Sequence, residues 1–159
     1  MFKESIPYLV IILVISTIRT FIITPIVVSG ESMFPTLEGK EVMILKKYDT
    51  KYERFDVVVV NKSVEGDNII KRVIGLPGET IKYKNSKLYI NDEVIEDKYA
   101  YGETEDFVSI TLDDDEYFLM GDNREISLDS RLIGIIKDYE IEGTAQFVLF
   151  PFKKIGNIE

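Results

Sequence analysis

Residues 68–83 read NIIKRVIGLPGETIKY. The runs Asn68–Ile74 and Thr80–Tyr83 are rich in Ile, Val and Tyr, and Leu76-Pro77-Gly78 between them is a turn-forming sequence. The pattern predicts two short strands joined by a tight connection.

Similar runs continue on both sides of this stretch. Further strands are predicted at Val42–Leu45, Asp56–Val60, Lys87–Ile90, Phe107–Leu112, Tyr117–Met120 and Thr144–Phe150, with turns at residues 65–68, 85–86 and 91–92. No segment after residue 25 has a helical period, and no repeat is visible. Many short strands with tight turns predict a mainly β protein, with an all-β domain of the barrel or sandwich type.

The N-terminal segment has a different composition. Residues 5–23 read SIPYLVIILVISTIRTFII, and as a helix these positions span roughly 28 Å, close to the hydrocarbon core of a bilayer. Arg19 lies near the end of the run, where its side chain can reach the interface. A cleavable signal peptide and a buried core helix are the alternatives; the following TPIVVSGESM has no clear small-x-small site. We therefore expect a single-pass membrane anchor over residues 1–25 and a β-rich domain over 26–159.

Composition excludes several function classes. Lys plus Arg is 19 and Asp plus Glu is 28, a net charge of −9, which argues against a nucleic-acid partner. The chain has no His and no Cys, so a Ser-His-Asp triad, a thiol nucleophile and a His-ligated or thiolate zinc site are impossible. A hydrolase with this composition needs Ser, Thr or a carboxylate as nucleophile, and Lys, Tyr or a carboxylate as base.

Three segments hold residues that could carry such chemistry. In the first, residues 29–36, a turn with Gly30 and Pro35 could expose the Ser32 hydroxyl and backbone N–H groups, although a polar linker is the simpler interpretation. In the second, Lys71 interrupts an apolar strand, where burial would lower its pKa, although an edge lysine that reaches water is the alternative. The third, residues 121–131, is a polar loop between apolar strands, in which Asp129 could pair with Arg131 or with Arg72, although an Asx-rich surface loop is the alternative.

These three segments together resemble the bacterial type I signal peptidases, which are membrane-anchored endopeptidases with a Ser-Lys dyad. SGESMFPTL (29–37), IIKRVIGLPGE (69–79) and MGDNREISLDSR (120–131) match the three family boxes in the family order. DVVVV at 56–60, between the first two boxes, also fits. The resemblance covers the chain from the predicted anchor to about Arg131.

The resemblance implies a set of roles for these residues. Ser32 would be the nucleophile, with its backbone N–H in the oxyanion hole, and Lys71 the general base. Ser127 would orient Lys71, and Asp129 and Arg131, with Arg72, would support the site. Met33, Phe34 and Ile69 are candidates for the substrate pocket, with a place in the hydrophobic core as the alternative.

The resemblance also implies a substrate and a location. We expect release of exported preproteins by cleavage of their signal peptides after a small-x-small (Ala-x-Ala-like) motif. The catalytic domain would lie on the extracytoplasmic side of the cell membrane against the lipid bilayer, with no metal or organic cofactor. We expect a monomer.

One departure and several alternatives accompany this interpretation. Gly30 stands where some family members have a serine that helps the oxyanion hole, which leaves Ser29 as the candidate for the second donor. A conjugation or pilus processing peptidase of the same superfamily, and an inactive membrane-tethered binding protein, would share this sequence pattern. A self-cleaving Ser-Lys repressor would need a DNA-binding domain and a basic face, which this acidic chain does not have.

Overall fold

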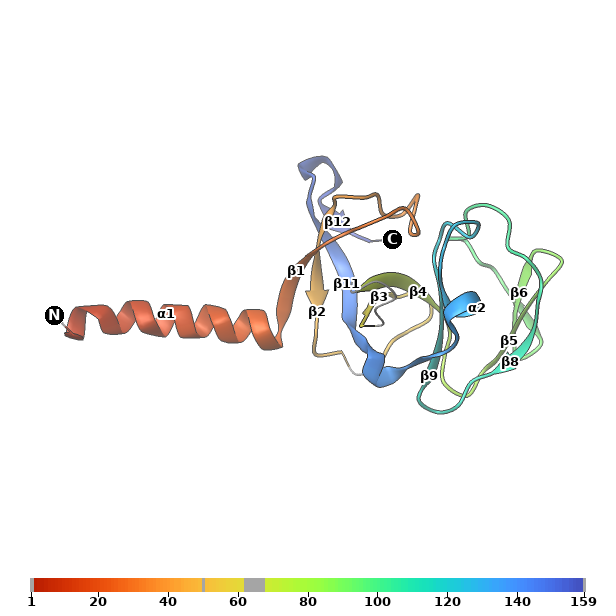
Figure 1. Cartoon of the computed structure of the whole chain (residues 1–159), viewed down its shortest axis with the longest axis horizontal. Coiled ribbons are helices and arrows are strands. Elements are labelled where there is room, and N and C mark those ends of the chain that lie inside the picture. Colours follow the sequence, from red (N-terminus) through yellow and green to blue (C-terminus); the bar gives the residue numbers. More distant parts are fainter. Residues whose placement is uncertain (1, 50, 62–67, 159) are drawn as a thin grey trace.

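The computed structural model describes residues 2–49, 51–61 and 68–158. It is mainly β, as the sequence predicts. A helix, α1 (Phe2–Phe21), extends away from a β-rich body, and β1 follows it directly (Figure 1). The predicted turn at residues 65–68 falls largely on 62–67, outside the described residues.

Two antiparallel sheets form the body. The strands are β1 (Ile23–Val27), β2 (Val42–Lys46), β3 (Val57–Val60), β4 (Ile69–Gly75), β5 (Thr80–Lys84), β6 (Lys87–Ile90), β7 (Glu93–Ile95), β8 (Phe107–Thr111), β9 (Glu116–Met120), β10 (Ile136–Lys137), β11 (Ile141–Phe150) and β12 (Gly156–Asn157). The short helices are α2 (Ser130–Ile133), η1 (Asp138–Glu140) and η2 (Phe152–Lys154). The larger sheet has the order β1-β2-β11-β3-β4-β9-β10, with β12 paired to β11; the smaller has the order β7-β6-β5-β8.

The strand β3 explains how the larger sheet is packed. All four of its valines are buried, and successive side chains of a strand point to opposite faces. Val57 and Val59 join one hydrophobic cluster with Met33 and Leu37, whereas Val58 and Val60 join a second cluster with other partners. Both faces of the sheet are therefore covered here, which is why this segment reads as an unbroken apolar run instead of an alternating one.

The turns of the smaller sheet follow from their sequences. Asn85 and Ser86 join β5 to β6, Asn91 and Asp92 join β6 to β7, and all four have positive φ. A two-residue hairpin with positive φ at both positions matches the twist of the flanking strands. Gly78, with φ +77°, follows Pro77 in the turn before β5, where the Glu79 N–H donates to the Leu76 carbonyl oxygen. These predicted turns are confirmed.

The chain enters the sheet earlier than the sequence suggests. Ile23–Val27 pair with Val42–Lys46, so residues 23–25 belong to β1, although the expected anchor extended to residue 25. The helix α2 is also absent from the prediction. It is four residues long, which is too short to show a helical period in the sequence.

The side chains of α1 are exposed over the residues for which they are described, including Leu9, Ile12 and Leu13. Over residues 2–49, 51–61 and 68–158, no helix combines the length and the hydropathy needed to cross a membrane. The membrane anchor stays a prediction.

Candidate active site

Ser32 lies in the loop between β1 and β2, and both ends of this loop are fixed. Val28 and Glu41 close it, because the Val28 N–H donates to the Glu41 carbonyl oxygen over 2.8 Å. Met33 and Leu37, joined by a backbone hydrogen bond, are buried in the core of the larger sheet. The loop is therefore fixed by a hydrogen bond between its two ends and by two side chains packed in the core, while Ser32 remains partly exposed.

Lys71 lies on β4, opposite Val58 of β3. Its side chain is buried at 4% exposure, and its Nζ donates to Ser32 Oγ over 2.8 Å and to the Ile70 carbonyl oxygen over 3.0 Å. The two residues are 39 positions apart in the sequence. This contact is the pairing of hydroxyl and amine that the two sequence segments predict.

Burial changes the acidity of Lys71. Desolvation lowers the pKa of the ammonium from 10.5 to about 8, against the opposing effect of the carboxylates of Asp129 and Asp122. A substantial fraction of this amine is thus neutral at mildly alkaline pH. A neutral amine at 2.8 Å from a hydroxyl is within reach to take its proton.

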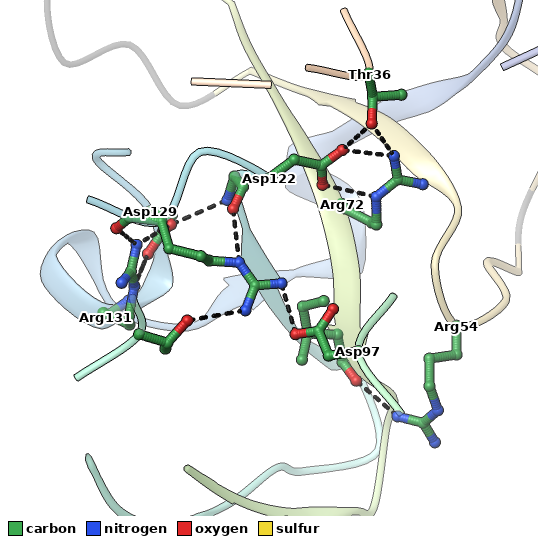
Figure 2. A network of polar contacts seen from close by, with 11 residues as sticks. Thr36, Arg54, Arg72, Asp97, Asp122, Asp129 and Arg131 are labelled. Atoms are coloured by element: carbon green, nitrogen blue, oxygen red, sulfur yellow. Dashed lines mark hydrogen bonds and ion pairs between the residues drawn. The ribbon is translucent and has the colours of Figure 1, made fainter. Parts of the chain in front are cut away.

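Arg72, the next residue along β4, forms a buried ion pair with Asp122. The Arg72 Nε and Nη2 atoms each donate over 2.7 Å, to Asp122 Oδ1 and Oδ2 respectively. Thr36 Oγ1 donates to the same carboxylate over 2.5 Å, so the Ser32 loop is joined to β4 through this pair (Figure 2). The alternative prediction, an ion pair of Arg72 with Asp129, is wrong, because the Arg72 guanidinium binds the Asp122 carboxylate instead.

Asp129 pairs instead with Arg131, as the other expectation has it. Arg131 Nε and Nη2 donate to the two Asp129 oxygens over 2.8 Å each, and the two side chains face each other in Figure 2. Asp129 also caps α2 and accepts from the Gly121 N–H over 3.0 Å. Arg131 Nη2 donates to the Arg124 carbonyl oxygen as well, so this pair closes the loop from Gly121 to Arg131.

Ser127 is buried within the same loop, but it does not make the predicted contact. Its Oγ has no hydrogen-bond partner among the described residues, so the orienting hydrogen bond to Lys71 is not formed. Lys71 Nζ uses Ser32 Oγ and the Ile70 carbonyl oxygen instead. A role for Ser127 in the reaction stays a prediction.

The loop with Ser127 lies against the Ser32 loop because Gly121 has no side chain. A Cβ at Gly121 would overlap the Ser32 carbonyl oxygen and Ser127 Oγ. The Asn123 N–H donates to that same Ser32 carbonyl oxygen over 3.0 Å. Gly121 therefore permits the close approach of two segments that lie about ninety positions apart in the sequence.

The three candidates for the substrate pocket have different environments. Phe34 lines a surface hollow together with Ser29 and Gly30. Met33 is buried in the core cluster of β2, β3 and β11, and Ile69 packs against the cluster on the other face of the sheet. Of the three, Phe34 is the one that borders this hollow.

Sequence reasoning missed the partners that arrange the site. Asp122, Thr36 and Arg124 are buried or half-buried and were not assigned roles. Asp122 and Arg124 stand at the start of the third box, so a polar segment between apolar strands was the available signal. Thr36 stands in the first box, but its contact with Asp122 depends on the fold of the Ser32 loop. Among the described residues, no group of three or more His, Cys, Asp or Glu side chains is placed to hold a metal ion.

A mainly β body, with a serine hydroxyl in contact with a buried lysine, has the layout of a hydrolase that works without histidine. Residues 2–150 match the family model described as signal peptidase, peptidase S26. The chain belongs to this family, which confirms the enzyme class predicted from the sequence, a serine endopeptidase.

Similar proteins agree with this assignment. Signal peptidase I from Bacillus amyloliquefaciens is 42% identical over 153 residues, covering 87% of this chain and 82% of the relative. Signal peptidase I S from Bacillus subtilis (strain 168) is 40% identical over 156 residues, covering 87% and 83%. A solved signal peptidase I from Enterococcus faecalis V583 aligns with a TM-score of 0.53 and 34% identity, covering 59% of this chain and 96% of that chain.

Proposed function

We propose that this chain is a membrane-attached signal peptidase I that removes signal peptides from exported preproteins by cleaving after a small-x-small motif. Ser32 is the nucleophile and Lys71 is the general base. The observation that carries the proposal is the 2.8 Å contact between Lys71 Nζ and Ser32 Oγ, made by a lysine whose pKa is lowered by burial.

The reaction follows from this contact. Neutral Lys71 takes the proton of the Ser32 hydroxyl as Ser32 Oγ bonds to the carbonyl carbon of the last signal-peptide residue. The Lys71 ammonium then protonates the leaving amine of the mature protein. A water molecule, deprotonated by Lys71, releases the signal peptide from Ser32.

The developing oxyanion needs donors that are already in position. The Ser32 N–H is one, since no described residue accepts a hydrogen bond from it. Gly30 has a φ of +80°, so the backbone changes direction two residues before Ser32. Ser29, the residue before Gly30, is the candidate for the second donor. Loss of one such donor typically costs about 10²–10³ in rate.

Membrane attachment is assigned to α1. Its exposed apolar side chains include Leu9, Ile12 and Leu13, and the helix extends away from the body (Figure 1). We assign the body to the extracytoplasmic side of the cell membrane, where signal peptides of exported preproteins emerge. A tether of this kind raises the effective concentration of enzyme and substrate in the plane of the membrane.

Cleavage of a preprotein with an Ala-x-Ala site tests the catalytic part of the proposal. The full chain in detergent is compared with Ser32→Ala and Lys71→Met, and Ser109→Ala and Lys82→Met serve as matched controls on the smaller sheet. Mass spectrometry of the products identifies the cleaved bond. The dyad is supported if the wild type and both controls cleave the preprotein once, after the small residue, and if Ser32→Ala and Lys71→Met do not cleave it.

Two outcomes would count against it. Equal cleavage by all five proteins assigns the activity to other residues or to a contaminant. Silence of the wild type on several preproteins favours an inactive binding protein on the same fold.

A separate experiment tests attachment. The full chain is mixed with phosphatidylglycerol vesicles, floated and washed with alkaline carbonate, beside a Leu9→Asp and Leu13→Asp double variant. Retention of the wild type and release of the variant support the anchor. Release of both contradicts it.

A further inference from the structure

The connection from β7 to β8 in the smaller sheet contains residues 97–101, with the sequence DKYAY. These residues lie outside all three sequence segments of the proposed site. We call these residues the strap. They nevertheless contact each of those three segments, and the contacts come from three side chains and from the backbone.

Tyr99 contacts the segment that carries Lys71. The centre of its ring lies 3.6 Å from Arg72 Cζ, so the ring covers one face of the guanidinium whose edge binds Asp122. An aromatic ring over a guanidinium attracts it through the ring quadrupole and excludes water from that face. Tyr99 therefore shields the ion pair that links β4 to the Ser32 loop.

Asp97 contacts the third segment. Its Oδ2 lies 2.6 Å from Arg124 Nη2, and the two side chains are 4% and 0% exposed. Neither Asp97 oxygen has an aligned hydrogen-bond donor among the described residues, so the attraction is ionic. Figure 2 shows Asp97 apart from the Asp122 and Asp129 carboxylates, as the third acidic group of the network. Arg124 in turn donates to the Gly121 carbonyl oxygen over 2.9 Å.

Tyr101 completes the set. Its N–H donates to the Asp122 carbonyl oxygen over 2.8 Å, and its own carbonyl oxygen accepts from the Arg124 N–H over 2.9 Å. Its ring meets that of Phe34, two residues after Ser32, edge to face at 5.1 Å. Between these two hydrogen bonds lies Asn123, whose N–H donates to the Ser32 carbonyl oxygen.

We propose that the strap, residues 97–101, is a positioning element through which the smaller sheet holds the Ser32 loop, β4 and the 121–131 loop in one arrangement, with Tyr99 and Asp97 as its anchoring side chains. This inference rests on the proposed function. None of the strap contacts reaches Ser32 Oγ or Lys71 Nζ, so the strap acts through Arg72, Asp122 and Arg124 and not on the reacting atoms.

The kinetic test compares Tyr99→Leu with Tyr99→Phe, using the full chain in detergent and the Ala-x-Ala preprotein. Tyr99→Leu removes the aromatic face from Arg72, and a small displacement of the dyad is expected to lower kcat between about 10- and 100-fold with KM within about twofold. Tyr99→Phe keeps the ring and is expected to retain kcat within about twofold. Tyr89→Leu is the matched control, because Tyr89 lies under Lys82 on the same sheet, away from the site.

Amide hydrogen exchange measures the effect of the strap on its neighbouring segments and needs no substrate. In Tyr99→Leu we expect faster exchange of the Asn123 and Arg124 amides, whose acceptors are on Ser32 and Tyr101, and unchanged exchange in β5 and β6. Asp97→Asn, which keeps the shape of the side chain and removes its charge, should act on the same amides and serves if Tyr99→Leu does not fold.

The outcomes separate the strap from the proposed function. If the wild type does not cleave the preprotein, the proposed function is refuted, while the hydrogen-exchange pattern still tests the proposed role of the strap. Unchanged exchange and unchanged kcat in both Tyr99→Leu and Asp97→Asn overturn the strap. Equal loss of kcat in Tyr99→Phe and Tyr99→Leu also overturns it, because the ring would then not be the element that acts.

Discussion

Arg72 and Asp122 face each other through two hydrogen bonds of 2.7 Å, with exposed fractions of 2% and 0%. Arg72 follows the candidate base, and the Asp122 carboxylate also accepts the Thr36 hydroxyl of the candidate nucleophile loop. One ion pair thus links both halves of the proposed dyad. The pair fixes the relative positions of the two segments more than it stabilises the fold, because the free energy needed to desolvate the two charges is about as large as the free energy of their attraction.

Removal of one partner should therefore be severe. Asp122→Asn leaves the Arg72 guanidinium buried without a counter-charge, and we expect a loss of about 3–5 kcal/mol in the free energy of unfolding. Urea denaturation measures this. Asp92→Asn, which breaks an exposed pair with Lys82, is the control and should change little. Similar stability of the two variants would mean that water screens the Arg72 pair.

Lys71→Met should stabilise the protein while it abolishes cleavage. The folded chain binds the Lys71 proton more weakly than the unfolded chain, because the pKa falls from 10.5 to about 8. Stability from this group therefore rises with pH between about 8 and 10.5, and the full penalty of about 3 kcal/mol applies below that window. Methionine carries no such penalty, so the gain in urea denaturation should be larger at pH 7 than at pH 9.5. A variant less stable than wild type at pH 7 contradicts the desolvated lysine.

The pH dependence of cleavage should report the same group. We expect kcat/KM to rise with pH through a midpoint near 8, since only the neutral amine accepts the Ser32 proton. The measurement is initial-rate cleavage of the preprotein between pH 6 and 10, with enzyme stability checked at each pH. A midpoint near 10 would show a lysine in ordinary contact with water.

Gly121→Ala should separate the two loops. The added Cβ overlaps the Ser32 carbonyl oxygen and Ser127 Oγ, so the hydrogen bond from the Asn123 N–H must lengthen. We expect a loss of about 1–3 kcal/mol in the free energy of unfolding and a lower kcat. Gly39→Ala is the control for stability, since the nearest atom to its Cβ would be the Gly30 carbonyl oxygen at 3.6 Å. Equal stability of both variants would show that the loops shift without cost.

Ser127→Ala should separate stability from activity. Its Oγ is buried with no partner among the described residues, so removal of the hydroxyl should leave the free energy of unfolding unchanged or slightly increased. If the hydroxyl engages Lys71 when substrate binds, kcat falls. Thermal denaturation and preprotein cleavage together measure this. Loss of stability with full activity would assign Ser127 a purely structural role.

Some parts of this architecture could be predicted because they depend on local sequence. Short apolar runs predicted most of the strands, and the pairs Asn85-Ser86 and Asn91-Asp92 predicted two turns, whereas the short strand β7 after the second turn was not predicted. The resemblance of three boxes identified Ser32 and Lys71 as neighbours, although they come from different elements.

The remaining parts depend on tertiary contacts. The choice of Asp122 over Asp129 as the partner of Arg72 depends on the pairing of β4 with β9, in which Arg72 lies opposite Met120, two residues before Asp122. The segment Ile23–Val27 reads as the end of an apolar run, and its pairing with β2 is what makes it a strand. The role of Tyr99 depends on where the smaller sheet lies, which no local pattern contains.

The position of β11 has a consequence for when the larger sheet can be completed. The strands β2 and β3 follow each other in sequence, yet β11 lies between them in the sheet. The Ser32 loop belongs to the half with β1 and β2, and Lys71 to the half with β3 and β4. A nascent chain that ends before residue 141 has no strand to fill this place, so its two halves are joined by side-chain and loop contacts such as the Arg72–Asp122 pair but not by strand pairing. The larger sheet is therefore complete only after almost the whole chain has been synthesised.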